Sequence, residues 1–111
     1  MNPNLPIRRQ RLTTDRQGRI CKIEVSIAQT ADSNMYQPDG QKCVFKVLRE
    51  KLKGEEEFEI VLLIDNHSPF RFHNHSQLPL NHEVRETIHA SNWIEAWRIF
   101  DKKVRELLDE A

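Results

Sequence analysis

Residues 20–28 read Ile-Cys-Lys-Ile-Glu-Val-Ser-Ile-Ala, and their pattern, compared with that of residues 93–108, is the clearest indication of the fold. Apolar side chains stand at every second position in it, which predicts a half-buried β-strand. In residues 93–108, apolar side chains instead recur every three or four positions, which predicts an amphipathic helix. The change of period therefore predicts strands first and one long helix last.

Five further stretches complete the expected sheet. Residues 7–14, 43–48, 58–64, 70–75 and 83–89 are short, apolar or alternating, and turns separate them. Residues 58–64 are apolar on both faces, which favours a central strand. We expect an α+β fold, with an antiparallel sheet of four to six strands and the C-terminal helix packed on one face. The 111 residues suit a single domain, 1–111, that begins with an irregular segment over residues 1–6.

The charges balance over the chain but not along it. Lysine and arginine total 17 and so do aspartate and glutamate, so no general attraction to nucleic acid or membrane is implied. Arg8, Arg9 and Arg11 nevertheless cluster near the start. They are candidates for binding a negatively charged substrate, although charge runs more often only solvate a strand.

Neither the cysteines nor the apolar segments indicate export or a membrane. Cys21 and Cys43 lie in apolar strand-like stretches at a spacing typical of no zinc or redox motif, so we expect buried, reduced thiols. No apolar run approaches the length of a membrane span, and residues 1–11 do not resemble a signal peptide. A cytoplasmic protein without a membrane partner is the expectation.

A histidine-rich segment holds the candidate chemistry. Four of the five histidines lie between His67 and His82. If residues 70–75 form a strand, Arg71, His73 and His75 share one face, because side chains alternate along a strand. Asp65 ends the preceding strand and is expected nearby as a fourth catalytic residue, whereas His67 and His82 are candidates for substrate binding.

Three interpretations of this segment remain open. In the first, His73 and His75 act as general base and acid in metal-independent RNA cleavage, and Arg71 stabilises the phosphorane. In the second, His-x-His binds a metal ion, with His82, Asp65 or Glu83 as a third ligand. In the third, the histidines only make hydrogen bonds, and the chain is a non-enzymatic protein-interaction module. No HExxH or CxxC motif accompanies the pair, and the residues alone leave all three interpretations open.

A family resemblance favours the first interpretation, RNA cleavage with neither metal nor cofactor, and this is the prediction. Asp65-Asn66-His67 followed by Phe72-His73-Asn74-His75 resembles the TumE-like toxins of bacterial toxin–antitoxin pairs, over roughly residues 56–110. The positions that match are Asp65, Asn66, His73 and His75. The resemblance implies a toxin acting on RNA, with an antitoxin protein as its partner.

Overall fold

Six strands form one antiparallel sheet in which every strand pairs with the next strand along the chain. The computed structural model describes residues 5–110 apart from 33, 38, 69 and 70. The elements are β1 (Ile7–Thr14), β2 (Ile20–Gln29), β3 (Gln41–Glu50), β4 (Phe58–Asp65), β5 (His73–Gln77), β6 (Asn81–Thr87) and α1 (Trp93–Glu110). The expected α+β class is confirmed, and β4 is an interior strand as predicted. No helix in the described residues is long and apolar enough to cross a membrane.

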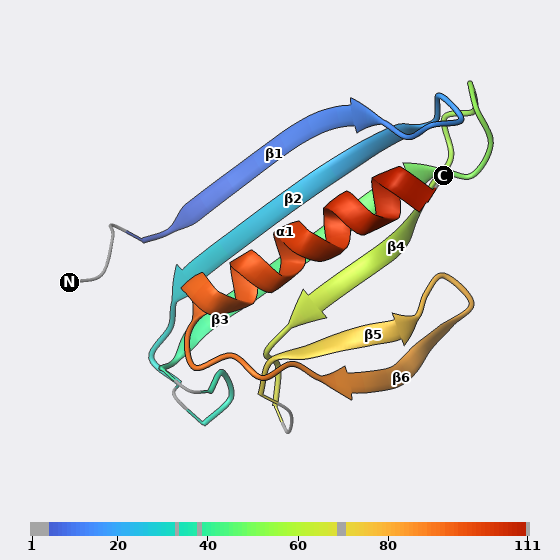
Figure 1. The fold of residues 1–111 in the computed structure, drawn as a ribbon. Coiled ribbons are helices and arrows are strands. Elements are labelled where there is room, and N and C mark those ends of the chain that lie inside the picture. The colour runs from blue at the N-terminus through green and yellow to red at the C-terminus, as the bar shows by residue number, and fades with distance from the viewer. Residues whose placement is uncertain (1–4, 33, 38, 69–70, 111) are drawn as a thin grey trace.

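The helix covers one face of the sheet. Figure 1 shows α1 running along β3, between β2 and β4. Phe100 is fully buried, and its ring centroid lies 5.6 Å from that of Phe45 on β3. The odd-numbered positions of β2 and β3, which include both cysteines, supply most of the apolar surface beneath the helix. The alternation that predicted β2 is therefore the alternation that builds the core.

Both tryptophans belong to α1, but their burial differs. Trp93 is buried, whereas Trp97 is only partly buried, and its ring centroid lies 6.3 Å from that of Phe45. The predicted helix start is confirmed. The Asn92 side chain accepts a hydrogen bond from the Glu95 amide, and the Glu95 carboxylate accepts one from the Ser91 amide. This reciprocal capping satisfies amides that a helix start leaves without partners.

Two strand predictions need correction. The strand expected at residues 70–75 begins only at His73, and the strand expected at 83–89 spans Asn81–Thr87. Arg71 lies in a bend before β5, so it does not share the strand alternation with the histidines. Phe72 is buried in the core, whereas Phe70 lies outside the described residues. The physical reason is that the chain must reverse direction after β4 before it can pair again.

Within the described residues, the second face of the sheet carries no helix, and we call it the open face. Because strand partners point to the same side of a sheet, the register defines which side chains share it. One row of direct cross-strand neighbours crosses the whole open face: Arg8, Ser26, Val44, Asp65, His73 and Thr87. The histidine cluster and one N-terminal arginine therefore lie on the same face.

Candidate functional site

The end of β4 and the start of β5 bring three polar side chains together. Asp65 is the register partner of His73, and His75 lies two positions further along β5 on the same face. Oδ1 of Asp65 lies 2.5 Å from Nε2 of His73, and Oδ2 lies 3.6 Å from Nε2 of His75. The two imidazole centroids are 5.1 Å apart. The expected proximity of these three residues is confirmed.

Backbone carbonyls fix the orientation of both imidazoles. Nδ1 of His73 donates to the carbonyl of Arg71, and Nδ1 of His75 donates to the carbonyl of His82, both at 2.8 Å. A carbonyl only accepts, so each Nδ1 carries the hydrogen. In a neutral imidazole the other nitrogen, Nε2, then carries the lone pair. The Nε2 atoms of both rings face Asp65. A hydrogen bond from Nε2 of His73 to the Asp65 carboxylate requires the imidazolium form, in which both nitrogens carry a hydrogen.

Burial and pairing set the charges of this cluster. Burial by itself would lower the pKa of His73, but the hydrogen bond to Asp65 and the carbonyl of Arg71 together raise it above its ordinary value. Burial would raise the pKa of Asp65, but the two imidazoles lower it. His75 is 8% exposed, and its Nε2 has no hydrogen-bond partner among the described residues. One ring nitrogen is thus buried, oriented and unsatisfied.

The other predicted residues of the histidine segment do not join the cluster with their side chains. Arg71 contributes its backbone carbonyl, and its exposed side chain lines a shallow hollow beside Ser91 and Glu95. His82 is exposed and likewise contributes only a carbonyl. His67 is exposed and stands edge-on to Tyr36, with 5.7 Å between ring centroids. The predicted placement of Arg71 beside both histidines is therefore wrong, because Arg71 precedes the strand.

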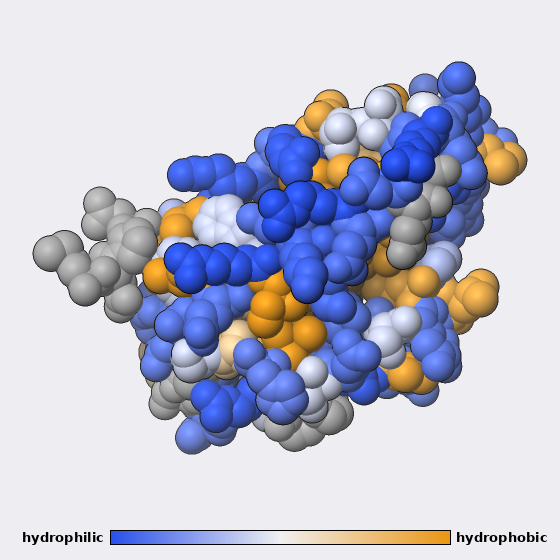
Figure 2. Space-filling view, viewed as in Figure 1, coloured by the Kyte–Doolittle hydropathy of each residue, from blue (hydrophilic) through white to orange (hydrophobic). Residues whose placement is uncertain are grey.

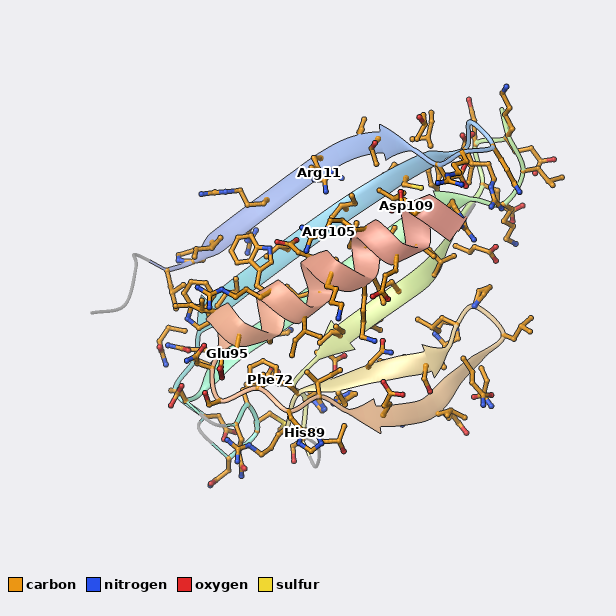
Figure 3. All side chains as sticks on the ribbon, in the orientation of Figure 1. Arg11, Phe72, His89, Glu95, Arg105 and Asp109 are labelled. Atoms are coloured by element: carbon orange, nitrogen blue, oxygen red, sulfur yellow. The ribbon has the colours of Figure 1, made fainter. Side chains whose placement is uncertain are left out.

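The three N-terminal arginines are divided between the two faces of the sheet. Arg8 lies on the open face, in the same row as Asp65, whereas Arg9 and Arg11 alternate to the helix side. Arg11 and Arg105 are both visible from that side in Figure 3, and the surface there is largely hydrophilic (Figure 2). A substrate on the open face can thus meet Arg8 but not Arg11.

Sequence reasoning missed Arg85. It is the register partner of His75, so it lies on the open face next to the cluster, and its positive charge opposes protonation of His73. The signal lay in the spacing of β6, where Arg85 and Thr87 share one parity. The expected strand 83–89 contained Arg85, but the register of this strand against β5 does not follow from the sequence.

Comparison of the chain with protein-family models, with curated proteins and with solved structures finds no match. The resemblance to TumE-like toxins therefore stays a prediction.

Proposed function

We propose that the chain binds RNA across the open face and cleaves it at the Asp65–His73–His75 cluster. The observation that carries the proposal is the shared row: Val44 is the register partner of Asp65, and it also lines a hollow of about 460 Å³ on the same face. Arg8, Lys42 and Lys46 line this hollow as well. Adjacent strands lie about 4.8 Å apart, so Arg8 stands roughly 14 Å from Asp65, a span that covers several phosphates of a nucleic acid strand.

The charges of this hollow favour a polyanion. Glu24 is its one acidic residue, and it is bound by Lys46 at 3.5 Å and by Gln10 at 2.8 Å. Within the described residues, neither Arg8 nor Lys42 forms an ion pair. Both side chains are exposed, which leaves two cations available to phosphates.

An aromatic side chain stands beside the cations. Nζ of Lys42 lies 5.9 Å from the ring centroid of Tyr36, and Tyr36 is partly exposed next to His67. Proteins that bind single strands combine cations along the backbone with aromatic rings on which bases stack. This combination favours a nucleic acid over an acidic peptide, which would need the cations alone.

The binding half of the proposal can be tested with a labelled, mixed-sequence single-stranded RNA and its DNA copy. For single strands, the logarithm of affinity falls with the logarithm of salt concentration with a slope of about −0.7 per phosphate contact. The double variant Arg8→Ala/Lys42→Ala should bind more weakly and reduce that slope by roughly 1.4. The double variant Arg11→Ala/Arg105→Ala removes the same charge from the helix side and should leave the slope unchanged. Equal losses in both variants would overturn the assigned face.

The cleavage half is tested on the same RNA by gel analysis. His75→Ala should lower the rate by roughly 10²–10⁴-fold, the usual contribution of a positioned proton-transfer group or a comparable site residue. His89→Ala is the matched control, because His89 is exposed on the segment between β6 and α1. Cleavage of the DNA copy at the same rate would show that the ribose 2′-hydroxyl takes no part in the reaction. No cleavage by the wild-type chain would end the proposal of an endoribonuclease.

One observation favours the rival function of a protein-interaction module. A second hollow of about 460 Å³ lies between β1 and α1, and its lining includes Arg11, Trp97, Asp101 and Arg105. An apolar floor edged by charges suits a partner segment that adds to the free edge of β1. Loss of partner binding in Arg11→Ala/Arg105→Ala, with RNA binding intact, would establish it. The antitoxin partner and the cytoplasmic location remain predictions.

A further inference from the structure

The side chains of Asp65, His73 and His75 are arranged differently from what RNA cleavage by two free histidines requires. A general acid–base pair must present its nitrogens to the substrate, yet His73 and His75 are 3% and 8% exposed. Both Nε2 atoms point to the carboxylate of Asp65 instead of outward. Asp65 is the most accessible of the three, with a side chain that is 21% exposed.

We propose that Asp65, His73 and His75 bind one divalent transition-metal ion through two imidazole nitrogens and one carboxylate oxygen. Suitable ligand atoms of the three residues all lie within 4.8 Å of one another. Around a tetrahedral zinc ion with bonds of about 2.0–2.1 Å, ligand atoms lie roughly 3.3 Å apart. A small rotation of the partly exposed Asp65 side chain would open the 2.5 Å contact with His73 to that spacing.

The backbone supplies the second requirement of a histidine metal site. Metal-bound imidazoles almost always donate their other N–H to a carbonyl or carboxylate, which fixes the ring and directs the lone pair at the ion. His73 and His75 both meet this requirement, through the carbonyls of Arg71 and His82. The unsatisfied, buried Nε2 of His75 is then explained as a ligand atom.

The donor set selects the class of ion. Two imidazoles and a carboxylate suit zinc, iron, nickel or copper, whereas magnesium prefers oxygen ligands. The expectation of no metal rested on the lack of a third ligand at a familiar spacing in the sequence. Of the three candidates named for that ligand, Asp65 supplies it, because it lies beside His73 on the neighbouring strand. Three protein ligands also leave a coordination position for water or substrate, as in catalytic zinc sites.

The test measures metal binding directly and involves no RNA, so its outcome is independent of the proposed function. The full chain, freed of metal with EDTA and then dialysed, is titrated calorimetrically with Zn²⁺ and separately with Mg²⁺. We expect one Zn²⁺ per chain and no comparable binding of Mg²⁺. Zinc at about 100 times its dissociation constant should raise the melting temperature by roughly 10 °C.

Variants identify the ligands. Removal of even an outer hydrogen-bond partner of a metal ligand costs about 10–100-fold in affinity, so Asp65→Asn and His75→Ala should each lose at least about 100-fold. His89→Ala should bind Zn²⁺ as the wild type does. Because His75 is buried, each variant is first checked for a cooperative melt in EDTA. Asp65 is the more exposed ligand, so Asp65→Asn decides the outcome if His75→Ala does not fold.

Failure of this inference and failure of the proposed function have different signatures. Wild-type affinity for Zn²⁺ in Asp65→Asn, or no Zn²⁺ binding by the wild type, overturns the metal site whatever the RNA assays show. If the metal site is correct, EDTA abolishes any RNA cleavage, whereas cleavage by free histidines survives EDTA. A chain that binds Zn²⁺ but does not cleave RNA retains the metal site and loses only the nuclease proposal.

Discussion

Replacement of Asn66 should destabilise the protein far more than its position at a strand end suggests. Asn66 is 1% exposed, and its side chain makes three hydrogen bonds to the backbone. Oδ1 accepts from the Cys43 amide at 2.9 Å, and Nδ2 donates to the carbonyls of Gln41 at 2.8 Å and Gln37 at 3.1 Å. At about 1 kcal/mol net for each bond, Asn66→Ala should lower the free energy of unfolding by roughly 3 kcal/mol.

Urea denaturation followed by tryptophan fluorescence measures this loss. With m-values of about 1–3 kcal/mol/M, the midpoint should fall by roughly 1–3 M. Asn66→Asp should be at least as harmful, because its second oxygen would face two carbonyls where the amide donates. Asn34→Ala is the control, since Asn34 is exposed and surface changes stay within about 0.5 kcal/mol. A midpoint for Asn66→Ala within error of the Asn34→Ala value would refute the reasoning.

Three further predictions concern stability and reactivity. Burial would raise the pKa of Asp15, but hydrogen bonds from backbone amides and Arg19 lower it below its ordinary value. The ionised carboxylate therefore stabilises the folded chain. This stabilisation is complete above the pKa of the unfolded state and is lost as pH falls through the pKa of the folded state. The stability difference between wild type and Asp15→Asn, measured by urea titration, should therefore be constant above about pH 5 and shrink below pH 4. Phe100→Ala should cost about 3–5 kcal/mol in urea titrations, and Trp97→Ala less because Trp97 is partly exposed; the reverse order would contradict the packing. Burial raises the pKa of Cys43 to about 12, so a thiol reagent at pH 8 should label it only after denaturant is added, and rapid labelling of the native chain would show an open core.

Much of the fold follows from local pattern. The alternation in β2 and the three- and four-residue spacing in α1 each report a single buried face, so strand, helix and core were predictable. The strands around the histidines were less predictable. All five residues of β5 are polar, so the strand shows no polar–apolar alternation that could mark its start, although His73, Asn74 and His75 are buried. Their burial comes from the neighbouring strands, and a single-strand pattern does not contain it.

The candidate site was predictable in membership but not in geometry. His73, His75 and Asp65 stand out by residue type and proximity in sequence. The direction of each lone pair depends on carbonyls at Arg71 and His82, and backbone carbonyls occur at every residue whatever the sequence. The row that joins Arg8 to the cluster depends on four successive strand registers. Because the row depends on pairings between different strands, the spacing of residues within one strand does not predict it.

The pairing between β4 and β5 makes the cluster a seam between two parts of unequal stability. In the described part of the chain, these strands share only the pairs Ile64–Asn74 and Asp65–His73, while β1 to β4 pair along most of their lengths. The β5–β6 hairpin diverges from β4 beyond that point (Figure 1). Its amides should exchange with solvent by local opening well before the β2–β3–β4 core unfolds. Any ligand that bridges Asp65 and His75 would hold this hairpin against the sheet. Binding of such a ligand should therefore be measurable as slower amide hydrogen exchange along β6.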